Sequence, residues 1–251
     1  MRAPPPDIDM LGVIGLSPIG AEAAAALVAS RPAEAPFEYV VTANAQHLVL
    51  MARPGNALRP AYEAAWLRVN DGQVPRLLAR WATGARFALA TGSDMTVLLL
   101  RRHITAEDHV TIIGGSPDLP DALRRHYAVR HIHLHDPPMG YMDQPRAVAE
   151  AIRFVREHPA RFVFVTTGAP RSEQLLMRLK QEGGLTGTGL AFGSALRFAV
   201  GQVPRAPAWM RASGLEWLFR LLSEPRRLWR RYAVESAPVF LLAWRAWRGA
   251  R

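Results

Sequence analysis

Five short clusters of hydroxyl, carboxamide, carboxylate and glycine residues follow apolar runs, and each leads into a stretch with a helical pattern. They are Thr42-Ala43-Asn44, Asn70-Asp71-Gly72, Thr91-Gly92-Ser93-Asp94, Gly114-Gly115-Ser116-Pro117 and Thr167-Gly168-Ala169-Pro170. Backbone N–H groups and positive helix ends would converge at such positions, which suits the binding of phosphate groups. A single cluster more often marks only a helix cap and a turn. Five in succession are harder to explain in that way.

The elements that must position these clusters alternate between strand and helix patterns. The apolar, β-branched runs that predict strands are Met10–Ile14, Tyr39–Thr42, Leu67–Val69, Phe87–Ala90, His109–Ile113, His131–Leu134 and Phe162–Thr166, and the helical patterns include Ala21–Ala29, Leu77–Trp81, Val97–Arg102 and Arg146–Arg156. Such alternation predicts a mainly parallel sheet with both faces covered. Ligands of such sheets bind beyond the carboxyl ends of the strands, where the five clusters are expected.

The pattern changes after Ala191 to arginine-rich helices interrupted by prolines, so we expect an α/β domain over residues 1–203 and a helical appendage over 204–251. Residues 205–251 contain ten arginines and three glutamates, which is +7 of the net charge of +10, and five of the seven tryptophans. A basic, tryptophan-rich segment indicates an anionic partner, such as lipid headgroups, a diphosphate or nucleic acid. A solvated basic face remains the alternative.

Composition and missing motifs exclude several classes of protein. The 251 residues are 49% apolar and include no cysteine, which excludes a disulfide scaffold, a thiolate zinc site and a cysteine nucleophile. Neither a signal peptide nor a transmembrane span is visible, so we expect a cytoplasmic protein whose membrane contact is peripheral. The spacing of Gly12, Gly15 and Gly20 does not fit a dinucleotide-binding turn. The only lysine, Lys180, lies in a helical pattern, which excludes a P-loop.

Two patterns imitate metal sites. Asp7-Ile8-Asp9 has the spacing of a D-x-D metal clamp, but it precedes the first expected strand in a proline-rich terminus. His131, His133 and His135 share one face of a strand, an arrangement that can bind zinc or iron. A half-exposed strand with its apolar residues inward explains the histidines better, and we expect no metal.

Read in order, together with Gly140-Tyr141 and with Glu173 after Gly168-Ala169-Pro170, the clusters resemble those of the WecG/TagA/CpsF glycosyltransferases (glycosyltransferase family 26). The most specific similarity lies in three C-terminal stretches: Arg205-Ala206-Pro207-Ala208-Trp209-Met210, Gly214-Leu215-Glu216-Trp217-Leu218-Phe219-Arg220 and Glu224-Pro225-Arg226-Arg227-Leu228-Trp229-Arg230-Arg231-Tyr232. The resemblance covers roughly residues 40–232.

The resemblance implies a Rossmann-like α/β fold, with helices on both faces of the sheet, and a transferase that inverts the anomeric centre without a metal or another cofactor. The implied donor is a UDP-linked hexose or N-acetylhexosamine. The implied acceptor is a polyprenyl-diphosphate-linked saccharide in the assembly of cell-surface polysaccharide or teichoic acid.

Asp71 matches the candidate general base of the family, and Gly72 after it lets a substrate approach the backbone. Capping of the helix that starts near Gln73 is the alternative role for Asp71. The other candidates, for substrate binding, are Thr42, Asn44, Gly72, Ser93, Asp94, Gly114, Gly115, Tyr141, Gly168, Pro170, Glu173, Arg205, Arg220, Arg227 and Arg230. In the absence of a metal clamp, the arginines would stabilise the leaving diphosphate.

Three positions depart from the family's common pattern. Ser172 stands where glutamine is common, Arg197 stands where an aspartate is expected, and Pro137-Pro138-Met139 precedes Gly140-Tyr141 in an unusual form. Ser172 and Arg197 lie where a donor would bind. We therefore expect the donor sugar, or the way it is held, to differ from that of the better-known members.

The C-terminal segment combines arginines with apolar residues at helical spacing. Residues 239–247 are expected to lie in the membrane interface, on anionic lipid, whereas residues 215–222 fit membrane contact and packing on the sheet domain equally well. A nucleic-acid-binding module and a non-catalytic membrane scaffold are the rival functions. The first would not need five polar loops and the second would not need Asp71, so we expect no nucleic-acid partner. The sequence is compatible with a homo-oligomer.

Because no convincing D-x-D motif follows a strand, we predict that sugar transfer survives chelation. Activity in EDTA should equal activity in untreated buffer, measured as release of the nucleotide diphosphate. Loss of activity that manganese or magnesium restores would contradict this prediction, and would favour Asp7, Asp9 or the histidine strand as metal ligands.

Overall fold

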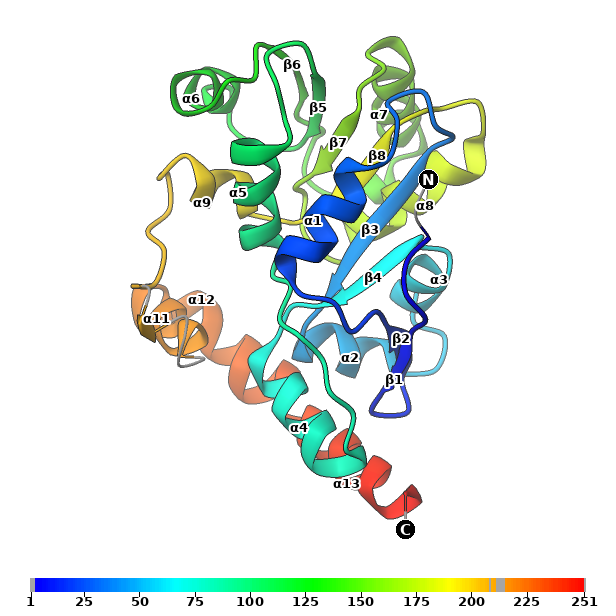
Figure 1. Cartoon of the computed structure of the whole chain (residues 1–251), viewed down its shortest axis with the longest axis vertical. Coiled ribbons are helices and arrows are strands. Elements are labelled where there is room, and N and C mark those ends of the chain that lie inside the picture. Colours follow the sequence, from blue (N-terminus) through cyan, green and yellow to red (C-terminus); the bar gives the residue numbers. More distant parts are fainter. Residues whose placement is uncertain (1–2, 208, 211–214, 251) are drawn as a thin grey trace.

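The computed structural model describes residues 3–207, 209–210 and 215–250, and only the backbone of Arg227 (Figure 1). Its centre is a six-stranded, fully parallel sheet with the strand order β4-β3-β8-β7-β5-β6. The strands are β3 (Glu38–Ala43), β4 (Leu67–Asn70), β5 (His109–Ile113), β6 (His131–His135), β7 (Phe162–Val165) and β8 (Thr188–Ala191). The chain therefore has the Rossmann-like α/β architecture expected from its alternating patterns.

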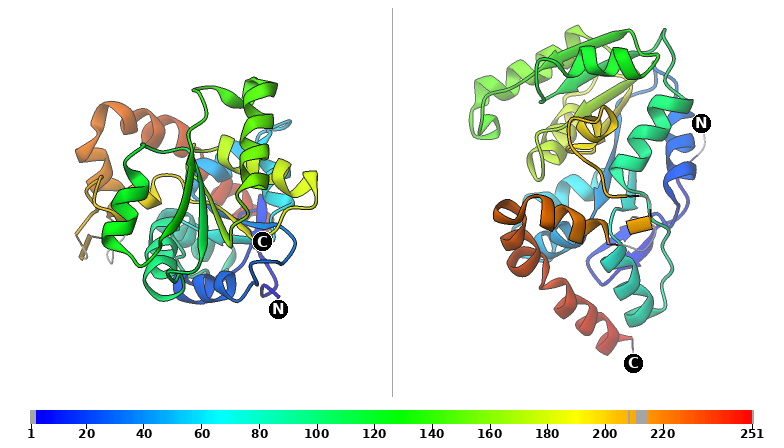
Figure 2. Two further views of the ribbon diagram at one scale, coloured as in Figure 1. Left: turned by 90° about the horizontal axis from the view of Figure 1, so that it is seen from above. Right: turned by 90° about the vertical axis from the view of Figure 1, so that its left-hand side faces the viewer.

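Helices cover both faces of the sheet, as Figure 2 shows. One face packs on α1 (Ala21–Ala29), α5 (Gly92–Arg102), α6 (Leu119–His126) and α9 (Ala195–Ala199), and the other on α2 (Ala45–Met51), α3 (Leu58–Glu63), α7 (Pro145–Glu157) and α8 (Arg171–Glu182). Successive strand residues point to opposite faces, so that Val40 of β3 lies in the first core and Val41 in the second. This two-sided burial explains the continuous apolar runs of the strands.

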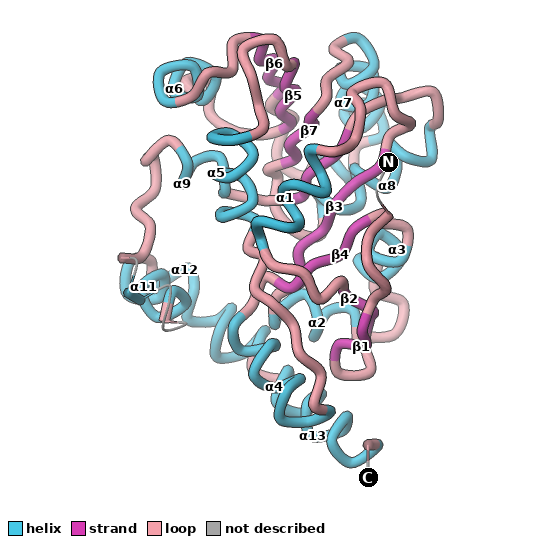
Figure 3. Tube along the Cα trace, viewed as in Figure 1, coloured by secondary structure: helices cyan, strands magenta, loops and turns pink. Residues whose placement is uncertain are grey.

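Two of the expected strands are wrong. The expected strand Met10–Ile14 is interrupted by a turn at residues 11–13, which joins β1 (Ile8–Met10) to β2 (Ile14–Leu16) in a separate antiparallel hairpin, and Gly12 has a φ of 70° in this turn. Phe87–Ala90 is a loop (Figure 3) that bonds through Ala88 N–H to Pro18 and through Ala90 N–H to Asn70, without a continuous ladder. Apolar character alone predicted strands where the backbone pairs only locally.

The central strand β8 was missing from the sequence-based prediction because its sequence, Thr-Gly-Leu-Ala, carries little β-branched or aromatic bulk. The small residue is needed there. A Cβ atom on Gly189 would lie 2.3 Å from Cδ2 of Leu176 and 2.8 Å from Cζ of Phe37. Tight packing of α8 and Phe37 on this strand therefore selects glycine against strand propensity.

The polar clusters lie at the carboxyl edge of this sheet in two groups. Those around Asn44, Asp71 and Ser93 belong to the β3 and β4 side, and those around Gly114 and Gly168 follow β5 and β7. The chain leaves β5 toward β6 but leaves β7 toward β8, so the strand order reverses between β5 and β7. Such a switch point is where ligands of open parallel sheets commonly bind.

The C-terminal helices are α11 (Glu216–Ser223), α12 (Pro225–Arg230), the π-helical segment η2 (Arg231–Ser236) and α13 (Val239–Gly249). Of these, α13 packs along α4 (Gln73–Thr83), and the π-helical segment η2 packs on α2 (Figure 1). Val239 and Ala243 of α13 are buried in the same core as α4, and the Trp247 and Trp81 rings stack with centroids 5.8 Å apart. Part of the segment expected at the membrane thus packs on the sheet domain.

The other C-terminal residues that were expected to be apolar contacts differ in their burial. No described residue of α11 is fully buried, so α11 is a partly exposed helix and not a core helix. Phe240, Leu241 and Trp244 of α13 are exposed. No described helix has both the length and the apolar character that a membrane span requires.

Candidate active site

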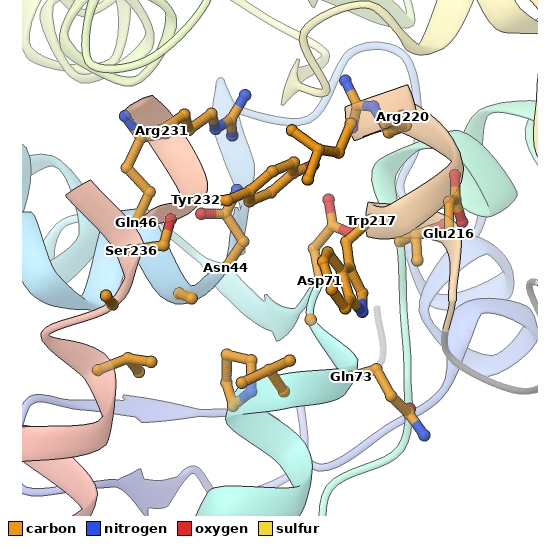
Figure 4. Close-up of a pocket in the computed structure, with 18 of the residues that line it drawn as sticks. Asn44, Gln46, Asp71, Gln73, Glu216, Trp217, Arg220, Arg231, Tyr232 and Ser236 are labelled. Carbon is orange, nitrogen blue, oxygen red and sulfur yellow. The ribbon is translucent and has the colours of Figure 1, made fainter. Parts of the chain in front are cut away.

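A pocket of about 530 Å³ lies between the carboxyl ends of β3 and β4, α4 and the C-terminal helices. In Figure 4, Glu216, Trp217 and Arg220 come from one side, Arg231, Tyr232 and Ser236 come from the other, and Asp71 lies between them. Five of the predicted site residues line this pocket: Asn44, Asp71, Gly72, Ser93 and Arg220. The structure therefore brings together residues that are almost 180 positions apart in the sequence.

Asp71 is held at the end of β4 by its backbone, because its N–H donates to the carbonyl of Ala43 at 2.8 Å. It does not cap α4, whose N-cap residue is Gly72 and has no side-chain bond. Instead, its Oδ2 accepts a hydrogen bond from the N–H of Gly92, the first residue of α5, at 3.4 Å. The hydroxyl of Thr42 also donates to the carboxylate. Asp71 therefore binds the first N–H group of α5 and does not act as the cap of α4.

The environment of Asp71 raises the proton affinity of its carboxyl group. Burial raises the pKa of Asp71 to about 7, and Glu216 adds to this, while the bond from Gly92, the guanidinium of Arg220 and the bond from Thr42 act in the opposite direction. A carboxylate with a pKa near 7 is much more basic than an ordinary aspartate and loses its proton close to neutral pH. Asp71 therefore has the protonation behaviour that a general base needs.

Asn44 is fixed beside this carboxylate by a buried network. Its Oδ1 accepts from the N–H of His47 at 3.2 Å, which caps α2, and its Nδ2 lies 3.4 Å from Nε2 of His47. Nδ1 of His47 lies 2.9 Å from the carbonyl oxygen of Thr42 and 2.8 Å from the hydroxyl of Tyr62. Burial, followed by Arg231, lowers the pKa of His47 to about 4. A neutral imidazole with Nδ1–H can donate to Thr42 and accept from the Asn44 amide.

Gly72 and the start of α5 complete this side of the pocket. A Cβ atom on Gly72 would lie 2.8 Å from Cδ of Pro75, so a larger residue would displace the first turn of α4. Thr91 caps α5 by accepting from Asp94 N–H at 3.0 Å. Arg205 donates to Asp94 Oδ1 at 2.6 Å, so these two predicted substrate-binding residues contact each other in this structure.

The other predicted residues form the second group, at the ends of β5 and β7. Gly114 has a φ of 89°, and a Cβ atom on it would lie 2.8 Å from Cγ2 of Thr167. The Tyr141 hydroxyl lies 3.1 Å from Oγ1 of Thr167, which lies 3.3 Å from Oγ of Ser172. Gly115, Gly168 and Pro170 belong to the same turns, and Gly115 and Gly168 also have positive φ. None of these residues lines the Asp71 pocket.

Glu173 lies in the first turn of α8 and is buried, and its Oε2 has no hydrogen-bond partner among the described residues. Burial raises its pKa to about 7. Ser172 beside it is also buried and occupies the position where glutamine is common in the resembled family. The hydroxyl of Thr167 is the neighbour of this shorter side chain. Arg197, the second departure, lines a smaller cavity that also includes Arg220.

The C-terminal arginines are distributed unevenly. Arg220 lines the pocket, whereas Arg230 is exposed and is not among its lining residues. Arg231 lines the pocket, although it was not among the predicted residues, and the predicted Arg227 has a side chain outside the described part of the chain. The arginine-rich signature was the signal that pointed to this region. The π-helical turn, which begins at Arg231, could not be foreseen from helical spacing.

The two imitations of metal sites have ordinary structural partners. Asp7 forms an ion pair with Arg68, and Asp9 accepts from the N–H of Gly12 at 2.7 Å within the hairpin turn. His131 stacks on His109 and His133 packs against His158. Among the residues that the structure describes, no three histidine, aspartate or glutamate side chains are placed to hold a metal ion together.

The raised pKa of Asp71 predicts a pH-dependent cost in stability. The folded protein keeps this proton up to about pH 7, whereas an unfolded aspartate loses it near pH 4. The free energy of unfolding therefore falls as pH rises through this interval. We expect Asp71→Asn to be more stable than wild type at pH 8 by about 1–2 kcal/mol, allowing for partial exposure to pocket water. Urea denaturation should show this gain vanish toward pH 4, and an equal gain at both pH values would contradict it.

Comparison with known protein families gives a match over almost the full chain. Residues 8–251 match the family described as "Glycosyl transferase WecG/TagA/CpsF family". This match includes the β1–β2 hairpin, both groups of polar clusters and all of the C-terminal helices. The chain belongs to the WecG/TagA/CpsF glycosyltransferase family, and the protein is a glycosyltransferase.

Proposed function

We propose that the protein transfers a hexose, an N-acetylhexosamine or a related sugar from a UDP-sugar to a polyprenyl-diphosphate-linked saccharide, in the synthesis of a cell-surface polysaccharide. The observation that carries this proposal is the Asp71 carboxyl, which has a pKa of about 7 and lines a pocket beside Arg220 and Arg231. This combination provides a base for an acceptor hydroxyl and cations for a diphosphate.

In the proposed reaction, an acceptor hydroxyl oxygen attacks the anomeric carbon of the donor sugar from the face opposite to UDP. The new C–O bond forms as the bond between the anomeric carbon and the diphosphate oxygen breaks, so the configuration is inverted. Asp71 accepts the hydroxyl proton, and UDP leaves with the bonding electron pair. Arg220 and Arg231 stabilise the negative charge on phosphate oxygens, and Asn44, oriented by His47, binds a sugar hydroxyl.

The second group of clusters is proposed as the remainder of the donor site. Gly114, Gly115 and Gly168 have positive φ values that turn the backbone sharply at the strand-order switch, and the Tyr141, Thr167 and Ser172 hydroxyls lie in one chain beside it. Backbone N–H groups in such turns bind anions. An ion pair between Arg205 and Asp94 ties the loop after α9 to the first turn of α5.

This proposal predicts that Asp71→Asn abolishes transfer, because a carboxamide has nearly the same shape but cannot accept the proton. A panel of UDP-sugars with a polyprenyl-diphosphate-linked acceptor should identify a donor whose UDP is released only when acceptor is present. For that donor, kcat/KM should rise with pH through about 7, and Asp71→Asn should lower it by roughly a hundredfold or more.

The matched control is Asp121→Asn, which makes the same chemical change at an exposed carboxylate on α6 and should transfer at the wild-type rate. Thermal melting should show that both variants are folded. A folded Asp71→Asn variant with near wild-type activity would place the base elsewhere. A rate that does not change between about pH 6 and about pH 8, on either side of the pKa of Asp71, would also count against Asp71.

We also propose that the exposed face of α13 contacts the anionic inner surface of the cytoplasmic membrane. It presents Phe240, Leu241 and Trp244, flanked by Arg245 and Arg248. Aromatic rings at the depth of the lipid headgroups and arginines on anionic lipid are typical of peripheral membrane helices. Such contact would bring the pocket to a lipid-linked acceptor.

Co-sedimentation with vesicles tests this contact. At low salt the full chain should bind vesicles that contain phosphatidylglycerol and bind phosphatidylcholine vesicles weakly, and added salt should weaken binding. Trp244→Ala should reduce binding several-fold, whereas Met139→Ala, which removes an exposed apolar side chain in the loop after β6, should not. Failure of the wild-type protein to bind anionic vesicles at low salt would overturn the membrane proposal.

A further inference from the structure

The N–H group of Gly92, which binds the Asp71 carboxylate, belongs to the first turn of α5, and side chains of α5 and its cap hold this turn in place. The Thr91 hydroxyl accepts from the N–H of Asp94 at 3.0 Å and donates to Oδ2 of Asp94 at 2.7 Å. The carbonyl of Gly92 accepts from the hydroxyl of buried Thr96 at 2.7 Å. The direction of the Gly92 N–H therefore depends on how this turn is fixed.

A residue from a distant part of the chain also binds the turn. Arg205, in the loop after α9, donates from Nη2 to Oδ1 of Asp94 at 2.6 Å. The two oxygens of the Asp94 carboxylate thus have different partners, Arg205 and Thr91. The side chains of Arg205 and Asp94 are only 19% and 35% exposed, so water screens this ion pair less than a fully exposed one. The loop after α9 is thereby anchored on the turn that binds Asp71.

The contact between Arg205 and Asp94 suits a role other than the substrate binding expected of both residues. Neither is among the described residues that line the Asp71 pocket. The negative charge of Asp94 also compensates the positive charge of Arg205, which weakens the attraction of this guanidinium for a diphosphate. Ser93, between Gly92 and Asp94, does line the pocket. The ion pair therefore supports a turn that forms part of the pocket wall.

We propose that Asp94 and Arg205 are positioning residues, which together hold the N–H group of Gly92 against the Asp71 carboxylate. The inference rests on the proposed role of Asp71 as the base and deepens it. When the ion pair is broken, the first turn of α5 loses its anchor and Asp71 loses a hydrogen-bond donor. The other groups that act on this carboxyl, which substitutions at Asp94 and Arg205 leave in place, are Thr42, Glu216 and Arg220.

A titration of Asp71 tests the inference without requiring turnover. The carboxyl carbon is followed by NMR in full-length protein with isotope-labelled aspartate, and its resonance is assigned by its absence from Asp71→Asn. The bond from Gly92 lowers the pKa of Asp71, so its loss should raise the pKa above the wild-type value of about 7. We expect a rise of roughly 0.5 in both Asp94→Asn and Arg205→Met.

The two variants distinguish positioning from a direct effect of charge. Through space, loss of the positive charge of Arg205 would raise the pKa of Asp71, but loss of the negative charge of Asp94 would lower it. A rise in both variants is expected only when the pair acts through Gly92. The double variant should shift the pKa no further than the larger single shift, because both substitutions break the same interaction. Opposite shifts, or no shift in either variant, would overturn the inference.

The matched control is Glu22→Gln, which removes an exposed ion pair between Glu22 and Arg102 at the other end of α5. It should match wild type in the pKa of Asp71 and in the rate of transfer. Thermal melting checks that every variant is folded, and Arg205→Met, which leaves the capping bonds of Asp94 with Thr91 in place, decides the question if Asp94→Asn does not fold.

Sugar transfer gives a second readout. In both positioning variants the pH midpoint of kcat/KM should move upward with the pKa of Asp71, while the KM of the UDP-sugar stays within about twofold of wild type. A large rise in this KM in Arg205→Met, with an unchanged midpoint, would assign Arg205 to the donor and overturn the inference. The expected shifts of the Asp71 pKa in a protein that transfers no sugar would support the positioning role and refute the proposed transferase reaction.

Discussion

The desolvation of one carboxyl group, that of Asp71, is the constraint on which the candidate site depends. β4 brings this side chain to the sheet edge, the first N–H of α5 and the Thr42 hydroxyl bind it, and the C-terminal helices line the pocket around it. Hydrogen bonds alone would keep the group acidic, and burial alone would oppose its ionisation entirely. Their balance places its pKa near neutrality, where a carboxyl can both accept and release a proton.

Much of the fold was predictable because parallel strands buried on both faces leave a strong apolar signal. β3, β5, β6 and β7 were expected at nearly their observed positions, and the helices α1 and α7 likewise. The prediction was wrong where residue type and pairing diverge. Phe87–Ala90 is apolar but makes only single hydrogen bonds to Pro18 and Asn70 instead of a strand ladder. β8 pairs on both sides although close packing requires glycine in its middle. Pairing depends on distant segments, which local patterns do not encode.

Individual residues of the candidate site were predictable from the sequence, but the tertiary packing that brings them together was less so. The spacing of polar residues after strands located Asp71, Asn44 and Ser93, and the arginine-rich signature pointed to the helices that close over them. The signature did not show which side chains of those helices reach the pocket. Arg231 lies in a π-helical turn, so its direction does not follow from a period of 3.6 residues, and Trp217 and Tyr232 enter the site only through tertiary packing. The division of the other clusters into a second group follows from strand order, which sequence spacing does not reveal.

Glu216 and Arg220 lie one helical turn apart on α11, and both act on the carboxyl of Asp71, with opposite effects on its pKa. The proton on Asp71 is consequently linked to the seating of that helix. Thermodynamic linkage is reciprocal, so any ligand or surface that shifts α11 also shifts the fraction of Asp71 that is ionised, and ionisation in turn changes the free energy of seating the helix. The fraction of Asp71 that is ionised thus depends on how closely the C-terminal helices cover the edge of the sheet.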